Sequence, residues 1–243
     1  MSNKEDINTY CSHFEERLEE IKTIENRFYC KILIVAVIDS LAHVVYPKER
    51  VGQRFINFIR NFSGWEDCNR VSLPQLVLNL PSDSITSELK MRIEERVESW
   101  QSGRIYRINE VDPCEQELER LATTQELRGL IEKSTHTELL YIYRNHLVHE
   151  FREPGNPLEI SSYDTSPYYC GVTKIETHNR DYSDKELREL MRSSRRTWEL
   201  VYPVGFFVSI AEKSLANLKH YLEENDLSPN SSYQFGSIWR PHS

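Results

Sequence analysis

The stretch from residue 135 to residue 151 reads THTELLYIYRNHLVHEF. Its start fits a capping box, because Thr135 is followed three residues later by Glu138. Pro154 and Gly155 come soon afterwards and predict where the element ends. Apolar residues recur at helical spacing between these limits, so the stretch predicts one amphipathic helix.

A helical wheel divides this helix into a core face and a mixed face. The apolar residues of the core face are Leu139, Leu140, Tyr143 and Leu147. The mixed face holds Tyr141, Arg144, Asn145, Val148 and His149. Such a face is too apolar for plain solvent and too polar for a core, which indicates an interface or the floor of a cleft. We therefore expect Arg144, Asn145 and His149 to point away from the core of their own protomer.

The remainder of the chain also predicts helices. Apolar residues recur at helical spacing in nearly every stretch, and the 243 residues include only 8 Gly and 10 Pro. Besides 135–151, the expected helices span residues 5–29, 28–45, 48–62, 73–80, 86–100, 115–122, 125–132, 184–196 and 197–224. Residues 102–113 are expected to form a loop, and Pro203 is expected to kink the last helix.

These elements predict an all-α fold in one domain spanning residues 1–243. We expect a helical core over about 5–152, an irregular segment over about 153–182 and C-terminal helices over about 183–225. The irregular segment contains YYCGVTKIET, which fits a short hairpin. Helix starts are indicated by Ser72 and by two more capping boxes, which are Thr123 with Glu126 and Ser183 with Glu186.

Charge and composition limit where the protein works. The formal net charge is −8, so a nucleic-acid site must be a local basic patch on an acidic body. The first residues contain no apolar segment of a signal peptide. The most apolar run, 28–45, holds Lys31, Asp39 and His43, which predicts a buried core helix and not a membrane span. The five cysteines form no CxxC pair, and a cytoplasmic location fits them.

The six residues from Arg144 to His149 match the pattern R-[N/D/H]-x-x-x-H. In an all-α chain this pattern resembles the signature of the HEPN superfamily of helical ribonucleases and nucleotide-binding domains. The chain resembles the larger uncharacterised prokaryotic HEPN proteins more than the minimal ones, and the likeness in helix pattern covers about residues 28–224. The resemblance implies a HEPN-like bundle and a homodimer whose composite active site cuts RNA without metal or cofactor. It also implies a toxin or antiviral effector with an antitoxin or defence-system partner.

The residue types suit RNA cleavage, in which the 2′-OH of the RNA attacks the adjacent phosphorus. His149 can transfer a proton near neutral pH, and Arg144 can stabilise the charge of the phosphorane. Asn145 lies one turn before His149, so we expect it to orient the imidazole or to hold a phosphate oxygen. Some HEPN toxins carry a tyrosine two places after the motif histidine that a partner enzyme modifies. Phe151 stands there and has no hydroxyl, which puts that mode of control in doubt.

Accessory residues are expected around this triad. Tyr141 and His146 lie on the same helix, and Arg188, Arg192 and Arg195 form a basic ridge with Lys185 and Arg196 that can grip RNA phosphates. The alternative for the ridge is a solvated face paired with Glu186 and Glu189. Tyr163, Tyr168 and Tyr169 can stack bases, and their alternative role is loop packing.

Other interpretations of the same residues stay open. A zinc site at His146 and His149 lacks an evident third ligand. Asp39 lies in an apolar helix, where a structural ion pair with Arg54 is expected and a catalytic role is the alternative. The whole chain can also be a catalytically inactive HEPN module that binds a nucleotide, RNA or a partner protein, or a helical scaffold.

Overall fold

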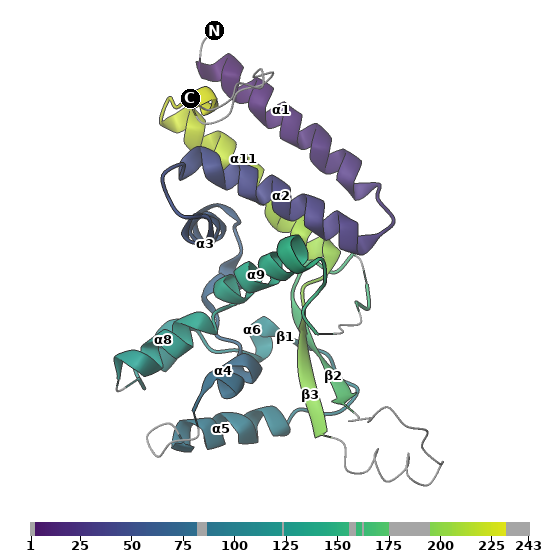
Figure 1. The fold of residues 1–243 in the computed structure, drawn as a ribbon, viewed down its shortest axis with the longest axis vertical. Helices are drawn as coiled ribbons and strands as arrows, with labels where there is room; N and C mark the ends of the chain where they lie inside the picture. The colour runs from purple at the N-terminus through teal and green to yellow at the C-terminus, as the bar shows by residue number, and fades with distance from the viewer. Residues whose placement is uncertain are drawn as a thin grey trace.

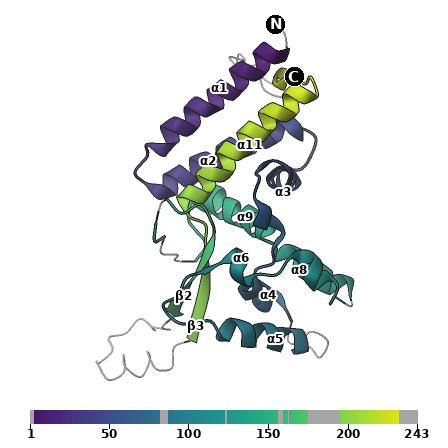
Figure 2. The same cartoon turned by 180° about the vertical axis from the view of Figure 1, so that it is seen from behind.

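The computed structural model describes residues 3–81, 87–122, 124–155, 159–161, 163–174 and 195–231. The chain forms two lobes (Figures 1 and 2). The bundle lobe consists of α1 (Asn3–Lys22), α2 (Arg27–Val45), α3 (Val51–Phe62), α9 (His136–Asn145) and α11 (Val204–Glu224). The sheet lobe consists of α4 (Leu73–Asn79), α5 (Ser87–Glu98), β1 (Tyr106–Arg107), α6 (Ile108–Val111), α7 (Glu115–Glu119), α8 (Gln125–Lys133), β2 (Tyr168–Lys174) and β3 (Arg195–Val201). Shorter turns are η1 (Glu66–Asn69), η2 (His146–Glu150) and η3 (Pro229–Ser231).

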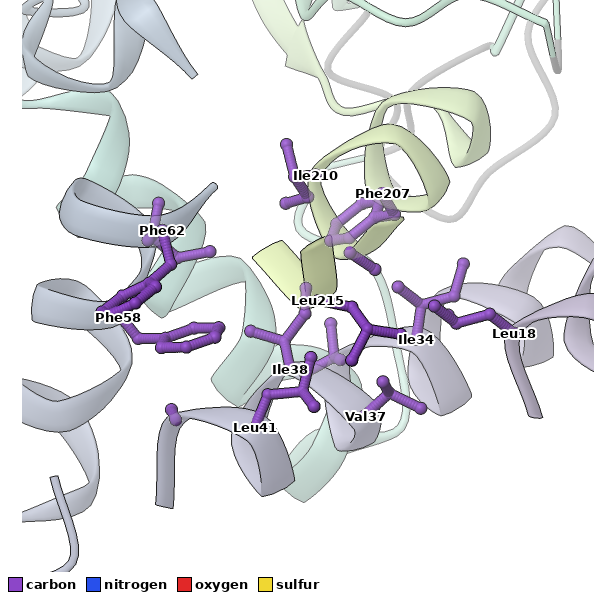
Figure 3. Close-up of a cluster of buried hydrophobic side chains, with 14 of the residues drawn as sticks. Leu18, Ile34, Val37, Ile38, Leu41, Phe58, Phe62, Phe207, Ile210 and Leu215 are labelled. Carbon is purple, nitrogen blue, oxygen red and sulfur yellow. The ribbon is translucent and has the colours of Figure 1, made fainter. Parts of the chain in front are cut away.

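Helix α2 is the centre of the bundle lobe. Its side chains Ile34, Ile38 and Leu41 are fully buried and pack against residues of α1, α3 and α11 (Figure 3). Asn26 begins the helix by accepting hydrogen bonds from the backbone amides of residues 28 and 29. Among the described helices α2 alone is long and apolar enough to cross a membrane, a property that core helices share. Its buried apolar side chains belong to the hydrophobic core of the bundle lobe.

The described strands form a three-stranded antiparallel sheet in the order β1-β2-β3, so the all-α prediction is incomplete. Strand β2 does not fold back into a local hairpin. It pairs along its whole length with β3, from Tyr168 opposite Val201 to Lys174 opposite Arg195. The expected loop at 102–113 contains both β1 and α6.

The predicted helix over 197–224 is wrong at its start. Residues up to Val201 belong to β3, and Pro203 occupies the N-cap position of α11 in place of kinking it. The physical reason is local. Proline disfavours helical geometry at the residue before it, which is Tyr202. The preceding residues include Thr197, Trp198 and Val201, which favour a strand once β2 is available for pairing.

Two of the four predicted helix starts can be tested directly. Ser72 caps α4 by accepting a hydrogen bond from the amide of Gln75 at 3.3 Å, as predicted. Thr135 does occupy the N-cap position of α9, but its hydroxyl donates to the carbonyl of Glu132 at 2.8 Å, so no capping box forms. Helix α8 is capped by Thr124. The predicted cap residue Thr123 and the box at 183–186 lie outside the described residues.

A buried polar network joins the two lobes at the start of α9. The imidazole of His136 lies 2.7 Å from a carboxylate oxygen of Asp112, and both side chains are fully buried. Tyr169 of β2 donates to the same carboxylate at 2.7 Å, and the backbone amide of Leu73 donates to its other oxygen at 3.1 Å. The hydroxyl of Tyr202 lies 3.3 Å from the second imidazole nitrogen of His136. Helix α9 is therefore held by both lobes.

Candidate active site

The motif residues lie where α9 changes its geometry. The α-helix ends at Asn145, and His146–Glu150 form one π-helical turn, in which the amide of Phe151 donates to the carbonyl of His146. Residues five apart differ by about 140° around an α-helix, whereas a π turn brings them onto one face. The side chains of Arg144 and His149 consequently meet, with Nη1 of Arg144 3.2 Å from Nε2 of His149.

Arg144 is buried and does not point away from the protomer core, so this part of the wheel prediction is wrong. Its side chain is only 9% exposed. The Nε and Nη2 atoms of Arg144 both donate to one carboxylate oxygen of Asp39 on α2, the first at 3.0 Å. From the sequence, Asp39 is expected to pair with Arg54. In the structure its partner is Arg144, so that expectation is wrong. The wheel assumed α-helical geometry throughout and could not show that α2 supplies this carboxylate.

Asn145 contacts the arginine of the motif. Its Oδ1 atom accepts a hydrogen bond from Nη1 of Arg144 at 3.0 Å. The same Nη1 atom faces the imidazole of His149. Within the described residues Asn145 makes no hydrogen bond with His149, so its expected role in orienting the imidazole is replaced by contact with Arg144.

The contact between Arg144 and His149 fixes which imidazole nitrogen is basic. A guanidinium donates hydrogen bonds and accepts none. Nε2 of His149 must therefore be the acceptor in this arrangement, with the ring proton on Nδ1. His149 is exposed to solvent, and so is its neighbour Val148. The arrangement places a basic nitrogen beside a fixed cation at the molecular surface.

The carboxylate of Asp39 is an unusual partner. Burial raises its pKa, and this effect outweighs the lowering by Arg144, by Arg54 and by His149. Its Oδ1 atom is buried without a hydrogen-bond partner among the described residues, since both bonds from Arg144 reach Oδ2. Asp39 thus holds the guanidinium in place while one of its oxygens is left unsatisfied.

A second buried cation holds the chain that leaves the π turn. Lys31 of α2 is 1% exposed, and its amine lies 3.1 Å from a carboxylate oxygen of Glu153 and 3.1 Å from one of Glu159. Tyr143 of α9 also donates to Glu153. Burial raises the pKa of Tyr143, and Glu153 raises it further. The segment after the motif is thereby fixed to α2, and Glu159 reaches the first amide of α11 at Val204.

The π turn ends on a residue in the left-handed conformation. Phe151 has a φ angle of 53°, which is rare for a residue with a large side chain. Its ring packs edge-on against Phe28 of α2, with ring centroids 5.1 Å apart, and against Tyr29. The left-handed conformation ends the helix directly after the motif, and the ring contacts help to offset its backbone strain.

Tyr141 and His146 have contacts with groups other than Arg144 and His149. Tyr141 is half-buried and packs on Phe55 and against Gly52 of α3. His146 lies 2.9 Å from Glu150, its neighbour one turn on. Arg195 begins β3, at the end of the sheet away from α9 (Figure 1). Arg188 and Arg192 of the predicted basic ridge lie outside the described residues.

The structure gives little support to base stacking by the tyrosine cluster or to a zinc site at His146 and His149. Tyr168 and Tyr169 are fully buried and therefore unavailable for stacking on bases, while Tyr163 is 90% exposed. Across the described part of the chain, no group of three or more His, Cys, Asp or Glu side chains is placed to hold a metal ion.

Sequence reasoning named Asp39 but gave it the wrong partner, and it missed the ion pairs of Lys31, which also lies on α2. Asp39 and His43 stand four residues apart in this mostly apolar helix, so they share one face of it. That spacing was the available signal for a polar site on α2. Nothing local in the sequence indicates that Lys31 binds Glu153 and Glu159. Comparison of the chain with protein-family models, with curated proteins and with solved structures gave no match.

Proposed function

We propose that the chain is a metal-independent endoribonuclease of HEPN type, in which Arg144 and His149 cut RNA through attack by its own 2′-OH. The observation that carries the proposal is the 3.2 Å contact between Arg144 and the basic nitrogen of His149 on the π turn. A proton-transfer group and a fixed cation are the two things that this reaction needs.

The geometry supports a specific order of events. A phosphate that reaches the site takes hydrogen bonds from Nη1 of Arg144, which releases Nε2 of His149. The freed nitrogen accepts the proton of the 2′-OH as that oxygen attacks phosphorus. The bond from phosphorus to the 5′-oxygen of the next nucleotide breaks, and that oxygen takes up a proton from the solvent to become a 5′-hydroxyl, while the phosphate closes into a 2′,3′-cyclic phosphate. Asp39 holds the guanidinium in place, aimed at the developing phosphorane. Asn145, which shares Nη1 with His149, then contributes its amide to the phosphate oxygens.

The proposal includes a homodimer with a composite site. Val148 is 40% exposed and Phe151 is 63% exposed, and both flank His149. Exposed apolar side chains beside a polar cluster are typical of an interface. The helical wheel placed Tyr141 on the same face as His149. Because Tyr141 packs against α3, it contributes less to the proposed dimer interface than the wheel predicted. An antitoxin or defence-system partner and a cytoplasmic location complete the proposal.

The competing function is a silent module that binds a nucleotide, RNA or a protein through the same surface. The basic nitrogen of His149 favours the enzyme, because binding alone needs no proton acceptor aimed at a guanidinium. A helical scaffold would need neither residue.

The test is cleavage of single-stranded RNA by the purified full chain and by the His149→Ala variant. Loss of proton transfer should slow cleavage by about 10²–10⁴-fold. The variant should stay folded because the side chain of His149 is exposed. His220→Ala is the matched control, since His220 is an exposed histidine on α11 whose side chain is 70% accessible. Equal rates for wild type and His149→Ala would reject the proposed mechanism.

A further inference from the structure

A second arginine–histidine pair joins α2 and α3. Nη1 of Arg54, in the first turns of α3, is 2.9 Å from Nδ1 of His43 near the end of α2. Both residues are half-buried. Because a guanidinium only donates, Nδ1 of His43 is the acceptor and the ring proton is on Nε2. The pair therefore offers only donors to a further ligand: the remaining N–H groups of Arg54 and the Nε2–H of His43.

This pair shares its surroundings with the candidate active site. His43 follows Asp39 by four residues on α2, so both lie on one helix face. Arg54 acts on the carboxylate of Asp39, as Arg144 and His149 do. Helices α2, α3 and α9 are neighbours (Figures 1 and 2), and the close approach of Gly52 to Tyr141 seats α3 against α9.

Among the residues that the structure describes, Arg54 forms no ion pair with a carboxylate. No Asp or Glu oxygen of the described residues lies within 4.0 Å of its guanidinium, and His43 is its one side-chain partner there. The nearby Asp39 is already engaged by Arg144. A half-buried guanidinium without a paired anion, next to another donor, is suited to an anionic oxygen ligand.

We infer that His43 and Arg54 form a second phosphate-binding subsite, which holds a phosphodiester of the RNA chain next to the one at Arg144 and His149. The inference rests on the proposed function, because it assumes that the substrate is an RNA chain. At least two phosphates of that chain would then contact the protein. Arg54 supplies a full charge and a fork of donors, and His43 supplies a single neutral donor. The subsite positions the RNA and takes no part in proton transfer.

The test separates binding from cleavage by using the His149→Ala protein as the parent. Binding of a short single-stranded RNA to this parent is followed by fluorescence anisotropy over a range of salt concentrations. Each phosphate contact made by a cation on single-stranded nucleic acid contributes about 0.7 to the slope of log affinity against log salt. Adding Arg54→Gln should make that slope shallower, with its magnitude smaller by about 0.7.

Three further variants sharpen the result. Arg54→Lys keeps the charge and should keep the slope. His43→Gln should weaken binding with the slope unchanged, because a neutral donor releases no counterion. Arg92→Gln is the control, since Arg92 is an exposed arginine on α5 whose side chain is 71% accessible, and it should change neither quantity. Thermal melting of each variant checks that it is folded.

Several outcomes would overturn the subsite. One is a slope for Arg54→Gln equal to that of the parent, and another is the same fall in slope for Arg92→Gln. A parent that binds no RNA would also reject it, as would a mononucleotide that binds in an Arg54-dependent way as tightly as the RNA. Failure of the proposed function has a different signature, which is RNA bound with an Arg54-dependent slope but never cut by the wild-type chain.

Discussion

At the scale of single residues, the ion pair between Asp39 and Arg144 decides how the motif arginine is presented. The carboxylate of Asp39 is buried enough that desolvation outweighs its attraction to nearby cations. Removal of either partner leaves the other charge poorly compensated. Arg144→Ala is therefore a worse probe of catalysis than the sequence indicated, because the arginine is a buried structural group as well as a candidate catalytic one.

A double-mutant cycle measures this coupling. We expect Asp39→Asn and Arg144→Gln each to lower the free energy of unfolding. The double variant should be less destabilised than the sum of the two by roughly 1–3 kcal/mol, because it contains neither unpaired charge. Urea denaturation of the four proteins checks it. Additive effects would show that the two side chains do not depend on each other.

The raised pKa of Asp39 also predicts a pH dependence. Because the pKa in the folded protein lies above that in the unfolded chain, the folded state holds the proton more tightly. The contribution of Asp39 to the free energy of unfolding should fall as pH rises from the ordinary pKa of an aspartate through the raised value. The measurement is the free energy of unfolding of wild type minus that of Asp39→Asn, taken at a series of acidic pH values. This difference should decrease as pH rises between the two pKa values. A difference that increases with pH would mean that the attraction of Arg144 outweighs burial.

Among single residues, the spacing in the sequence placed Arg144 and His149 in one candidate site, but sequence reasoning misassigned the partner of Asp39. Spacing along one helix is a local property, and it carries the six-residue pattern. The choice between Arg54 and Arg144 as partner of Asp39 depends on how α2, α3 and α9 pack. No single-sequence pattern states that packing.

At the scale of elements, the π turn is the feature that brings the motif side chains together. A continuous α-helix through residue 151 would separate Arg144 and His149 by about 140° around the helix axis. The turn is held on its inner side by Leu147, on its outgoing side by the Lys31–Glu153 pair and at its end by Phe151. The helix pattern in the sequence did not indicate this change, because a single π turn of five residues is too short to show a period of its own.

The left-handed end of the turn can be tested with two substitutions. Phe151→Ala and Phe151→Gly both lose the ring contact with Phe28, but only alanine keeps the steric cost of a positive φ. We expect the glycine variant to be more stable than the alanine variant by about 1 kcal/mol in urea denaturation. Glu16, exposed in the middle of α1, is the control site, where glycine should be the worse residue by about 1 kcal/mol. Alanine more stable than glycine at Phe151 would contradict the left-handed geometry.

Strands were the elements that sequence reasoning could least predict. Residues 195–201 have charged and apolar residues that fit a helix as well as a strand, and their pairing partner lies in β2, across the undescribed segment. Long-range pairing of this kind depends on tertiary structure. Helices α2, α3 and α4 were predicted well because a cap, a glycine and prolines mark their limits. The helix expected over 5–29 was too long, because α1 ends at Lys22 and Asn26 caps the start of α2.

At the scale of the whole molecule, the two lobes depend on the buried network around Asp112. The Asp112→Ala substitution leaves His136, Tyr169 and the amide of Leu73 without their shared acceptor. We expect the free energy of unfolding to fall by roughly 3 kcal/mol, as for loss of other buried hydrogen-bonded charges. This fall is measured by chemical denaturation, followed by circular dichroism and by tryptophan fluorescence. The two signals should show the same transition midpoint.

The matched control is Glu98→Ala at the exposed end of α5, which should shift stability by no more than about 0.5 kcal/mol. An Asp112→Ala protein as stable as this control would show that the network does not hold the lobes together. If the two signals moved apart, the lobes would unfold independently.

The most direct test of the central claim identifies the ends of the RNA products. The purified chain is incubated with single-stranded RNA in excess EDTA, and the products are weighed by mass spectrometry. Attack by the 2′-OH, with proton transfer by His149 and charge stabilisation by Arg144, predicts a 2′,3′-cyclic phosphate on one product and a 5′-hydroxyl on the other. An RNA methylated on every 2′-oxygen should stay intact. Cleavage that EDTA abolishes, or products that carry a 5′-phosphate, would contradict this mechanism.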